Sequence, residues 1–249
     1  MTRKPAIEVL NLSFRYSGDM DVLSGMSLTV ECGEVVGLLG INGAGKTTLF
    51  RLMIGLLQPR IGEVCVLGLS VTRERRRASQ RLGWVPDEPW LYPKLSALEN
   101  MNRFALLWSV PAAQAKARSE AWLEATELWS DRHRLVEEYS RGMRQRLAIG
   151  CALLHEPEVI VLDEPFNGLD MKSALWLRDL LRQKAAAGRA VLVSSHQPEA
   201  LDAIVDRLAL LQRGRIERDL TRSELRTEGG TAQVFLERER AARSSGTAI

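Results

Sequence analysis

The sequence is poor in cysteine, histidine and long apolar runs. It contains three cysteines and three histidines among 249 residues. Cys32, Cys65 and Cys151 are far apart, with no CxxC pair and no neighbouring histidine pair, which argues against a disulfide framework and against a zinc site. No apolar run approaches about 18 residues, the length that predicts a membrane-spanning helix. The sequence therefore predicts reduced thiols and a chain that does not span a membrane by itself.

An excess of charge of one sign is also missing. The net charge of +3 is too small to argue for a nucleic-acid partner, and none is expected. Residues 1–5 lead directly into a strand-like run, so we expect no signal peptide and a cytoplasmic location. The densest charge run, Arg73–Arg77, favours a solvated helix face, with contact to lipid headgroups or RNA as the alternative. At this length and composition the chain can bury a large core.

What the sequence does contain is a glycine-rich segment between two apolar ones. Residues 35–39 form an apolar run, and residues 49–54 repeat apolar positions as a helix does. Strand, glycine-rich loop and helix form the context in which GxxxxGK[ST] predicts a phosphate-binding loop. The residues of this loop are Gly40, Ile41, Asn42, Gly43, Ala44, Gly45, Lys46, Thr47 and Thr48.

The residue types of this loop suit a triphosphate. Its glycines allow backbone N–H groups to approach phosphate oxygens closely, and the following helix adds the positive end of its dipole. The Lys46 ammonium can bind the outer phosphates, and the Thr47 hydroxyl can ligate Mg²⁺. The alternative is a flexible glycine turn before a helix. Because strand, spacing and the Lys-Thr pair agree, we predict ATP with Mg²⁺ as the ligand.

A pair of acids follows the apolar run Val159–Leu162. This run is typical of a buried parallel strand, and its carboxyl end is where ligands bind in α/β sheets. Asp163 can hold Mg²⁺ there, and Glu164 can act on an attacking water as a base.

Further motifs complete a resemblance. Residues 139–147 resemble the signature motif of ABC ATPases, residues 162–165 the hydrolysis motif, residues 167–170 the D-loop and residues 194–196 the switch histidine. The resemblance covers about residues 6–215. It implies that Tyr16 stacks on adenine, that His196 joins Lys46 and Glu164 in catalysis, and that Ser140 and Gly142 bind the nucleotide of a partner subunit in a head-to-tail dimer.

The same segments predict the fold class, an α/β P-loop NTPase core with a mainly parallel sheet. Strand-like runs at residues 6–16 and 26–30 predict an antiparallel β subdomain before the loop. A helical subdomain is expected at about residues 94–145, inserted in the ABC ATPase domain of residues 6–215. Residues 216–249 are expected to form a C-terminal extension, with a loose tail at 237–249.

The sequence departs from the family pattern at informative positions. The commoner signature has glycine and glutamine where Arg141 and Met143 stand, and this form resembles a bacterial subgroup serving drug, antibiotic and ion exporters. The loop after Val85-Pro86 usually carries glutamine, and here it carries Asp87. A carboxylate can still ligate Mg²⁺, so Asp87 is a predicted metal ligand, with a purely structural role in its loop as the alternative.

These features predict an ATP-hydrolysing subunit of a bacterial-type ABC transporter, and they predict that this transporter is an exporter. The expected partners are a separate transmembrane permease subunit and a second ABC ATPase subunit, identical or not. The protein would then lie peripherally on the cytoplasmic face of the cell membrane. The alternatives are a soluble ABC ATPase acting on ribosomes or DNA, and a regulatory module that holds ATP without turnover.

Overall fold

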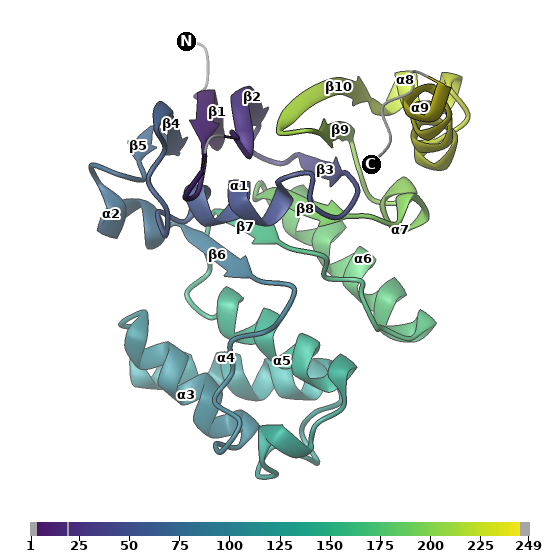
Figure 1. Cartoon of the computed structure of the whole chain (residues 1–249). Coiled ribbons are helices and arrows are strands. Elements are labelled where there is room, and N and C mark those ends of the chain that lie inside the picture. Colours follow the sequence, from purple (N-terminus) through teal and green to yellow (C-terminus); the bar gives the residue numbers. More distant parts are fainter. Residues whose placement is uncertain (1–3, 19, 245–249) are drawn as a thin grey trace.

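The main sheet carries the nucleotide loop at its centre (Figure 1). The computed structural model describes residues 4–18 and 20–244. The main sheet has the strand order β10-β9-β3-β8-β7-β6, and all neighbours run parallel except β10, which is antiparallel to β9. Its strands are β3 (Val35–Leu39), β6 (Leu82–Val85), β7 (Val159–Leu162), β8 (Ala190–Ser195), β9 (Arg207–Gln212) and β10 (Arg215–Thr221).

A second sheet lies beside the first and is wholly antiparallel, as the alternation near the N-terminus predicts. Its order is β2-β1-β4-β5, and the register pairs Ile7 with both Val30 and Val66. Its strands are β1 (Ile7–Phe14), β2 (Leu23–Val30), β4 (Ile61–Val66) and β5 (Leu69–Ser70). The predicted fold class is confirmed: a mostly parallel sheet, an antiparallel subdomain and helices.

The helices occupy two regions, next to the sheets and in a separate helical lobe (Figure 1). The helix α3 begins with a capping box, in which Ser96 and Glu99 satisfy each other's backbone N–H groups. The helices are α1 (Lys46–Met53), α2 (Arg75–Ser79), α3 (Ala97–Leu107), α4 (Ala112–Ala125), η1 (Val136–Glu138, a 3₁₀ turn), α5 (Arg141–Leu153), α6 (Met171–Ala186), α7 (Pro198–Asp202), α8 (Arg222–Thr227) and α9 (Thr231–Ser244).

Three apolar clusters hold these parts together. The first lies between the two sheets and includes Leu49 and Phe50 of α1. The second packs α5 and α6 against the other face of the main sheet, with Leu177 and Leu181 fully buried. The third fills the helical lobe. The expected insert at residues 94–145 covers α3, α4, η1 and the start of α5. Thus α5 belongs to two clusters and ties the lobe to the main sheet.

The C-terminal part contains more regular structure than its charged sequence indicates. The expected boundary at residue 215 falls at the start of β10, which pairs with β9 and so extends the main sheet. The expected tail at residues 237–249 continues helix α9 as far as Ser244, and residues 245–249 lie outside the described residues. This helix is anchored by Val234, which is buried in the second cluster, and by the Thr231 N–H, which donates to Asp202.

Within residues 4–18 and 20–244, no helix combines the length and the apolar character needed to cross a membrane.

Candidate nucleotide-binding site

The glycine-rich loop joins the central strand β3 to α1, as its sequence predicts. Gly43 and Gly45 have φ angles of 83° and 111°, which residues with a side chain rarely adopt. A Cβ at Gly40 would stand 2.6 Å from the carbonyl oxygen of Leu211, so only glycine fits there. The loop lines a pocket of about 290 Å³, together with Val22, Asp87 and Glu164.

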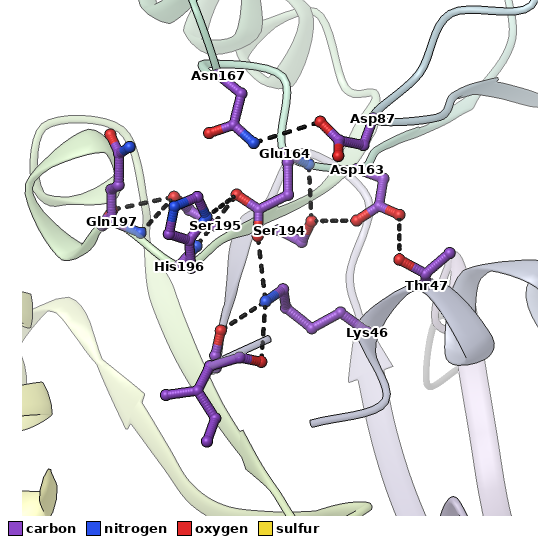
Figure 2. Close-up of polar contacts among 12 residues, drawn as sticks. Lys46, Thr47, Asp87, Asp163, Glu164, Asn167, Ser194, Ser195, His196 and Gln197 are labelled. Atoms are coloured by element: carbon purple, nitrogen blue, oxygen red, sulfur yellow. Dashed lines mark hydrogen bonds and ion pairs between the residues drawn. The ribbon is translucent and has the colours of Figure 1, made fainter. Parts of the chain in front are cut away.

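Lys46 lies buried at the bottom of this loop (Figure 2). Its Nζ donates to the carbonyl oxygens of Gly40 and Ile41 at 2.5 and 3.3 Å, and it forms an ion pair with Glu164 Oε1 at 3.1 Å. The two carbonyls and the carboxylate hold the ammonium at the centre of the loop. A cation in this position can bind a phosphate oxygen by exchanging one of these internal partners.

Asp163 follows β7 and is 1% exposed. Its carboxylate accepts from the hydroxyls of Thr47 and Ser194, each at 2.7 Å (Figure 2). Burial raises the pKa of this carboxyl, and the two hydroxyl hydrogen bonds partly oppose that effect. The structure therefore brings the two predicted metal ligands Asp163 and Thr47 into direct contact.

Glu164 is placed between the loop lysine and the switch histidine (Figure 2). Its Oε2 accepts from the backbone N–H of His196 at 3.1 Å and lies 2.8 Å from His196 Nδ1. The backbone of Glu164 has φ 48°, a left-handed angle that is uncommon outside glycine. Its N–H donates to the Ser194 hydroxyl at 2.9 Å, and this bond helps to hold the residue in that conformation.

Ser194 is a site residue to which the sequence gives no individual role. The parallel register pairs Leu162 with Val193, so that Asp163, the residue after β7, lies beside Ser194 within β8. Ser194 is completely buried and binds both acids at once, Asp163 through its proton and the Glu164 N–H through its oxygen. A serine at the end of the otherwise apolar run of residues 190–193 is the signal that could have identified it.

Tyr16 stands beside the end of the loop. Its hydroxyl is 3.2 Å from Thr48 Oγ1, and its ring packs edge-on against Phe14 with 4.9 Å between centroids. The residue is 45% exposed, so Tyr16 stands at the surface beside the loop. The structure thus brings Tyr16 next to the loop, in line with the role that the resemblance implies.

Asp87 lines the rim of the same pocket, while its carboxylate bonds to other partners. Asp87 Oδ1 accepts from Asn167 Nδ2 at 3.3 Å and lies 3.6 Å from Nη2 of Arg141 (Figure 2 shows the first contact). Asn167 and Arg141 are the further neighbours of the site that sequence reasoning did not connect with Asp87.

Ser140 and Gly142 do not line this pocket. Ser140 caps α5, where its hydroxyl accepts from the N–H of Met143 at 3.2 Å. A Cβ at Gly142 would meet only the Leu169 side chain, at 3.8 Å, so the first turn of α5 is open on that side. The structure therefore brings together all the predicted site residues except these two.

A glycine-rich loop around a buried lysine, facing two acids at a strand end, defines a nucleoside-triphosphate site of the P-loop class.

Comparisons with known proteins agree with this class. The family model described as ABC transporter matches residues 23–167. The daunorubicin resistance ATP-binding protein DrrA3 of Streptomyces coeruleorubidus is 37% identical over 229 residues, 92% of this chain and 72% of that protein. The Nod factor export ATP-binding protein I of Burkholderia orbicola is 37% identical over 209 residues, 84% of this chain and 68% of that protein.

A solved structure of an ATP-binding subunit of an ABC transporter is also similar. It superposes with a TM-score of 0.86 at 28% identity and covers 93% of this chain and 98% of the other. The chain belongs to the ABC transporter family, and it is an ATP-binding ATPase of that family.

Proposed function

We propose that this ATPase powers a membrane exporter as one half of a head-to-tail dimer that ATP closes and hydrolysis opens. The observation that carries the proposal is the separation between the P-loop pocket and the first turn of α5. Ser140 and Gly142 present N–H donors at a helix N-terminus, where phosphate groups bind well, yet they do not line the chain's own pocket. A second subunit would supply its nucleotide to this helix end.

In the proposed site, Glu164 takes the proton of the attacking water, and His196 keeps the carboxylate oriented. Their separation of 2.8 Å supports this division of roles. Lys46 binds the outer phosphates. The Thr47 hydroxyl and the Asp163 carboxylate, in contact at 2.7 Å, offer the oxygen donors that Mg²⁺ prefers. Mg²⁺ would offset the phosphate charge there, and Asp87 on the rim is a further proposed ligand.

The proposed permease partner has a suitable surface on the helical lobe. An apolar cavity of about 300 Å³ opens between this lobe and the main sheet, with Trp84, Trp90 and Trp108 among its walls. Leu106 and Leu107 nearby on α3 are 73% and 60% exposed. Large exposed apolar side chains beside such a cavity are typical of a protein interface. Docking there would place the protein on the cytoplasmic face of the membrane.

The exporter direction draws support from the relatives, one named for daunorubicin resistance and one for Nod factor export. To test direction, we would sequence the genes beside its own, co-express the chain with any multi-span membrane protein that they encode, and prepare inverted membrane vesicles. Accumulation of cargo in the vesicles that requires ATP is the expected result. A chain that binds no membrane protein and whose ATPase responds to ribosomes or DNA would support the soluble alternative.

The dimer is tested separately with Glu164→Gln, which should trap ATP. At saturating Mg²⁺-ATP we expect twice the monomer mass by light scattering after size exclusion. As a control, Gly142→Asp in the same background should keep ATP binding but remain monomeric, because a carboxylate at the α5 end repels phosphate. A monomeric Glu164→Gln protein at saturating ATP would refute the shared site.

A further inference from the structure

A carboxylate on the rim of a phosphate pocket creates an electrostatic problem. Asp87 lines the P-loop pocket together with Lys46, Thr47 and Glu164. The charge of Glu164 is offset by the ammonium of Lys46 at 3.1 Å. The carboxylate of Asp87 has no contact with that lysine, so its field would act against the phosphates unless another cation offsets it.

That cation comes from the first residue of α5. Arg141 Nη2 lies 3.6 Å from Asp87 Oδ1, the oxygen that also accepts from Asn167. The arginine reaches it by crossing Gly168, where a Cβ would stand 2.6 Å from Arg141 Cδ and 2.9 Å from its Nε. Gly168 also has φ +71°, so glycine meets a backbone and a packing requirement at once.

We propose that Arg141 is the counter-charge of Asp87, a positioning residue that keeps this carboxylate from repelling the triphosphate bound by the P-loop. Two of the positions at which the sequence departs from its family pattern, Asp87 and Arg141, are thereby explained as a pair. The proposal rests on ATP binding at the P-loop. It requires neither the dimer nor the export direction, so it can fail while they hold.

A purely mechanical link between α5 and the Asp87 loop would also account for the contact between Arg141 and Asp87. The charge of the bound ATP distinguishes a mechanical role of Arg141 from a counter-charge role. ATP without Mg²⁺ carries more negative charge than its Mg²⁺ complex, so a counter-charge matters most when Mg²⁺ is absent. A mechanical link would act equally on both forms. Asp87 and Arg141 are 51% and 57% exposed, so the effect must also fade as salt screens it.

The test is the Kd of ATP by isothermal titration calorimetry, in EDTA or in excess Mg²⁺, at about 0.01 M salt, where the Debye length is about 30 Å. In EDTA we expect Arg141→Gln to weaken binding about three- to fivefold, as suits a half-exposed ion pair. Adding Asp87→Asn to that variant should restore the wild-type Kd, and Arg141→Lys should stay close to it. In excess Mg²⁺ the defect should shrink to within about 1.5-fold.

The matched control is Lys94→Gln, which removes an exposed cation from an ion pair with Glu137 inside the helical lobe. Lys94→Gln should leave the Kd of ATP unchanged both in EDTA and in excess Mg²⁺. If Arg141→Gln does not fold by circular dichroism, Gly168→Ala provides a second route, because it displaces the arginine stem; its defect in EDTA should likewise disappear with Asp87→Asn.

Three results would overturn the proposal: an unchanged Kd for Arg141→Gln in EDTA, an equal loss with and without Mg²⁺, or a double variant as weak as Arg141→Gln alone. Failure of the wild-type chain to bind ATP in either buffer would count instead against the P-loop assignment.

Discussion

Glu164→Gln is the change for which the structure makes the most detailed prediction. The carboxylate has an oxygen on Lys46 at 3.1 Å and the other on the N–H and Nδ1 of His196 at 3.1 and 2.8 Å. Glutamine keeps the shape but takes up no proton, so we expect kcat to fall on the order of 100-fold or more. That corresponds to about 2.7 kcal/mol of transition-state stabilisation.

The same substitution should affect ATP binding and stability in opposite directions. If the amide oxygen stays on Lys46, its NH₂ group faces the N–H of His196, which loses its acceptor. An unsatisfied, partly buried donor costs about 1–3 kcal/mol, so the nucleotide-free protein should unfold more easily. Because a negative charge beside Lys46 is gone, the Kd of ATP should stay the same or tighten up to about threefold.

We would measure single-turnover hydrolysis, the Kd of Mg²⁺-ATP and urea unfolding on the same preparation. Glu158→Gln is the matched control, because it makes the same change at the other end of the same strand: Glu158 precedes β7, and Glu164 follows it closely. It should leave hydrolysis within about twofold of wild type. A loss below tenfold in Glu164→Gln would refute its role as base, and a much weaker Kd would refute the competition between Glu164 and phosphate for Lys46.

Three further changes should separate the roles of the site from those of the fold. Lys46→Ala should abolish hydrolysis and greatly weaken ATP binding; turnover within a few-fold of wild type, measured by phosphate release, would contradict the P-loop assignment. Asp163→Asn should abolish Mg²⁺-dependent hydrolysis yet unfold at a higher temperature at pH 7, by about 2–4 °C for each kcal/mol gained, because burial raises the pKa of Asp163 and so makes its ionised form costly. The cost of ionising Asp163 is absent below the ordinary pKa near 3.8 and grows as the pH rises through the raised pKa of the folded protein. The difference in melting temperature between Asp163→Asn and wild type should therefore vanish in acid. A variant that melts below wild type at pH 7 would contradict this prediction. Val234→Ala should lower the free energy of unfolding by about 2 kcal/mol while leaving ATP binding unchanged, because it removes buried methyl groups from the anchor of α9; an unchanged urea midpoint would mean that the helix does not stabilise the core.

The sequence predicted the parts of the site that lie within single segments. The P-loop needs only a strand, a loop and a helix in succession, and Asp163 needs only the end of an apolar strand. Ser194 was not identified because its partner Asp163 is 31 residues away and becomes its neighbour only through the β7–β8 register. The contact of Asp87 with Arg141 likewise depends on how the helical lobe packs, which no local pattern encodes.

The C-terminal part of the fold was underestimated for a different reason. β10 is an edge strand whose residues are mostly exposed or half-buried, with charged side chains at several positions, so its sequence reads like a loop. Among residues 231–237 of helix α9 only Thr231 and Val234 are buried, and the charged residues of its sequence resemble those of a tail. β10 is held by its pairing with β9, and α9 is held by Val234 in the second cluster and by the Thr231–Asp202 hydrogen bond. These contacts form only once the main sheet is assembled, so no local pattern shows them.

The charged and hydroxyl groups of the P-loop site have partners within the protein, and an incoming triphosphate must compete with those contacts. Lys46 is bound to Glu164, Thr47 to Asp163 and Asp87 to Arg141. A triphosphate with its cation must exchange the first two of these contacts, so the measured affinity is the difference between new contacts and those lost. In the proposed mechanism this exchange would also free the Glu164 carboxylate from the lysine while His196 continues to hold it. We therefore expect ATP binding itself to prepare Glu164 for its proposed role as the base.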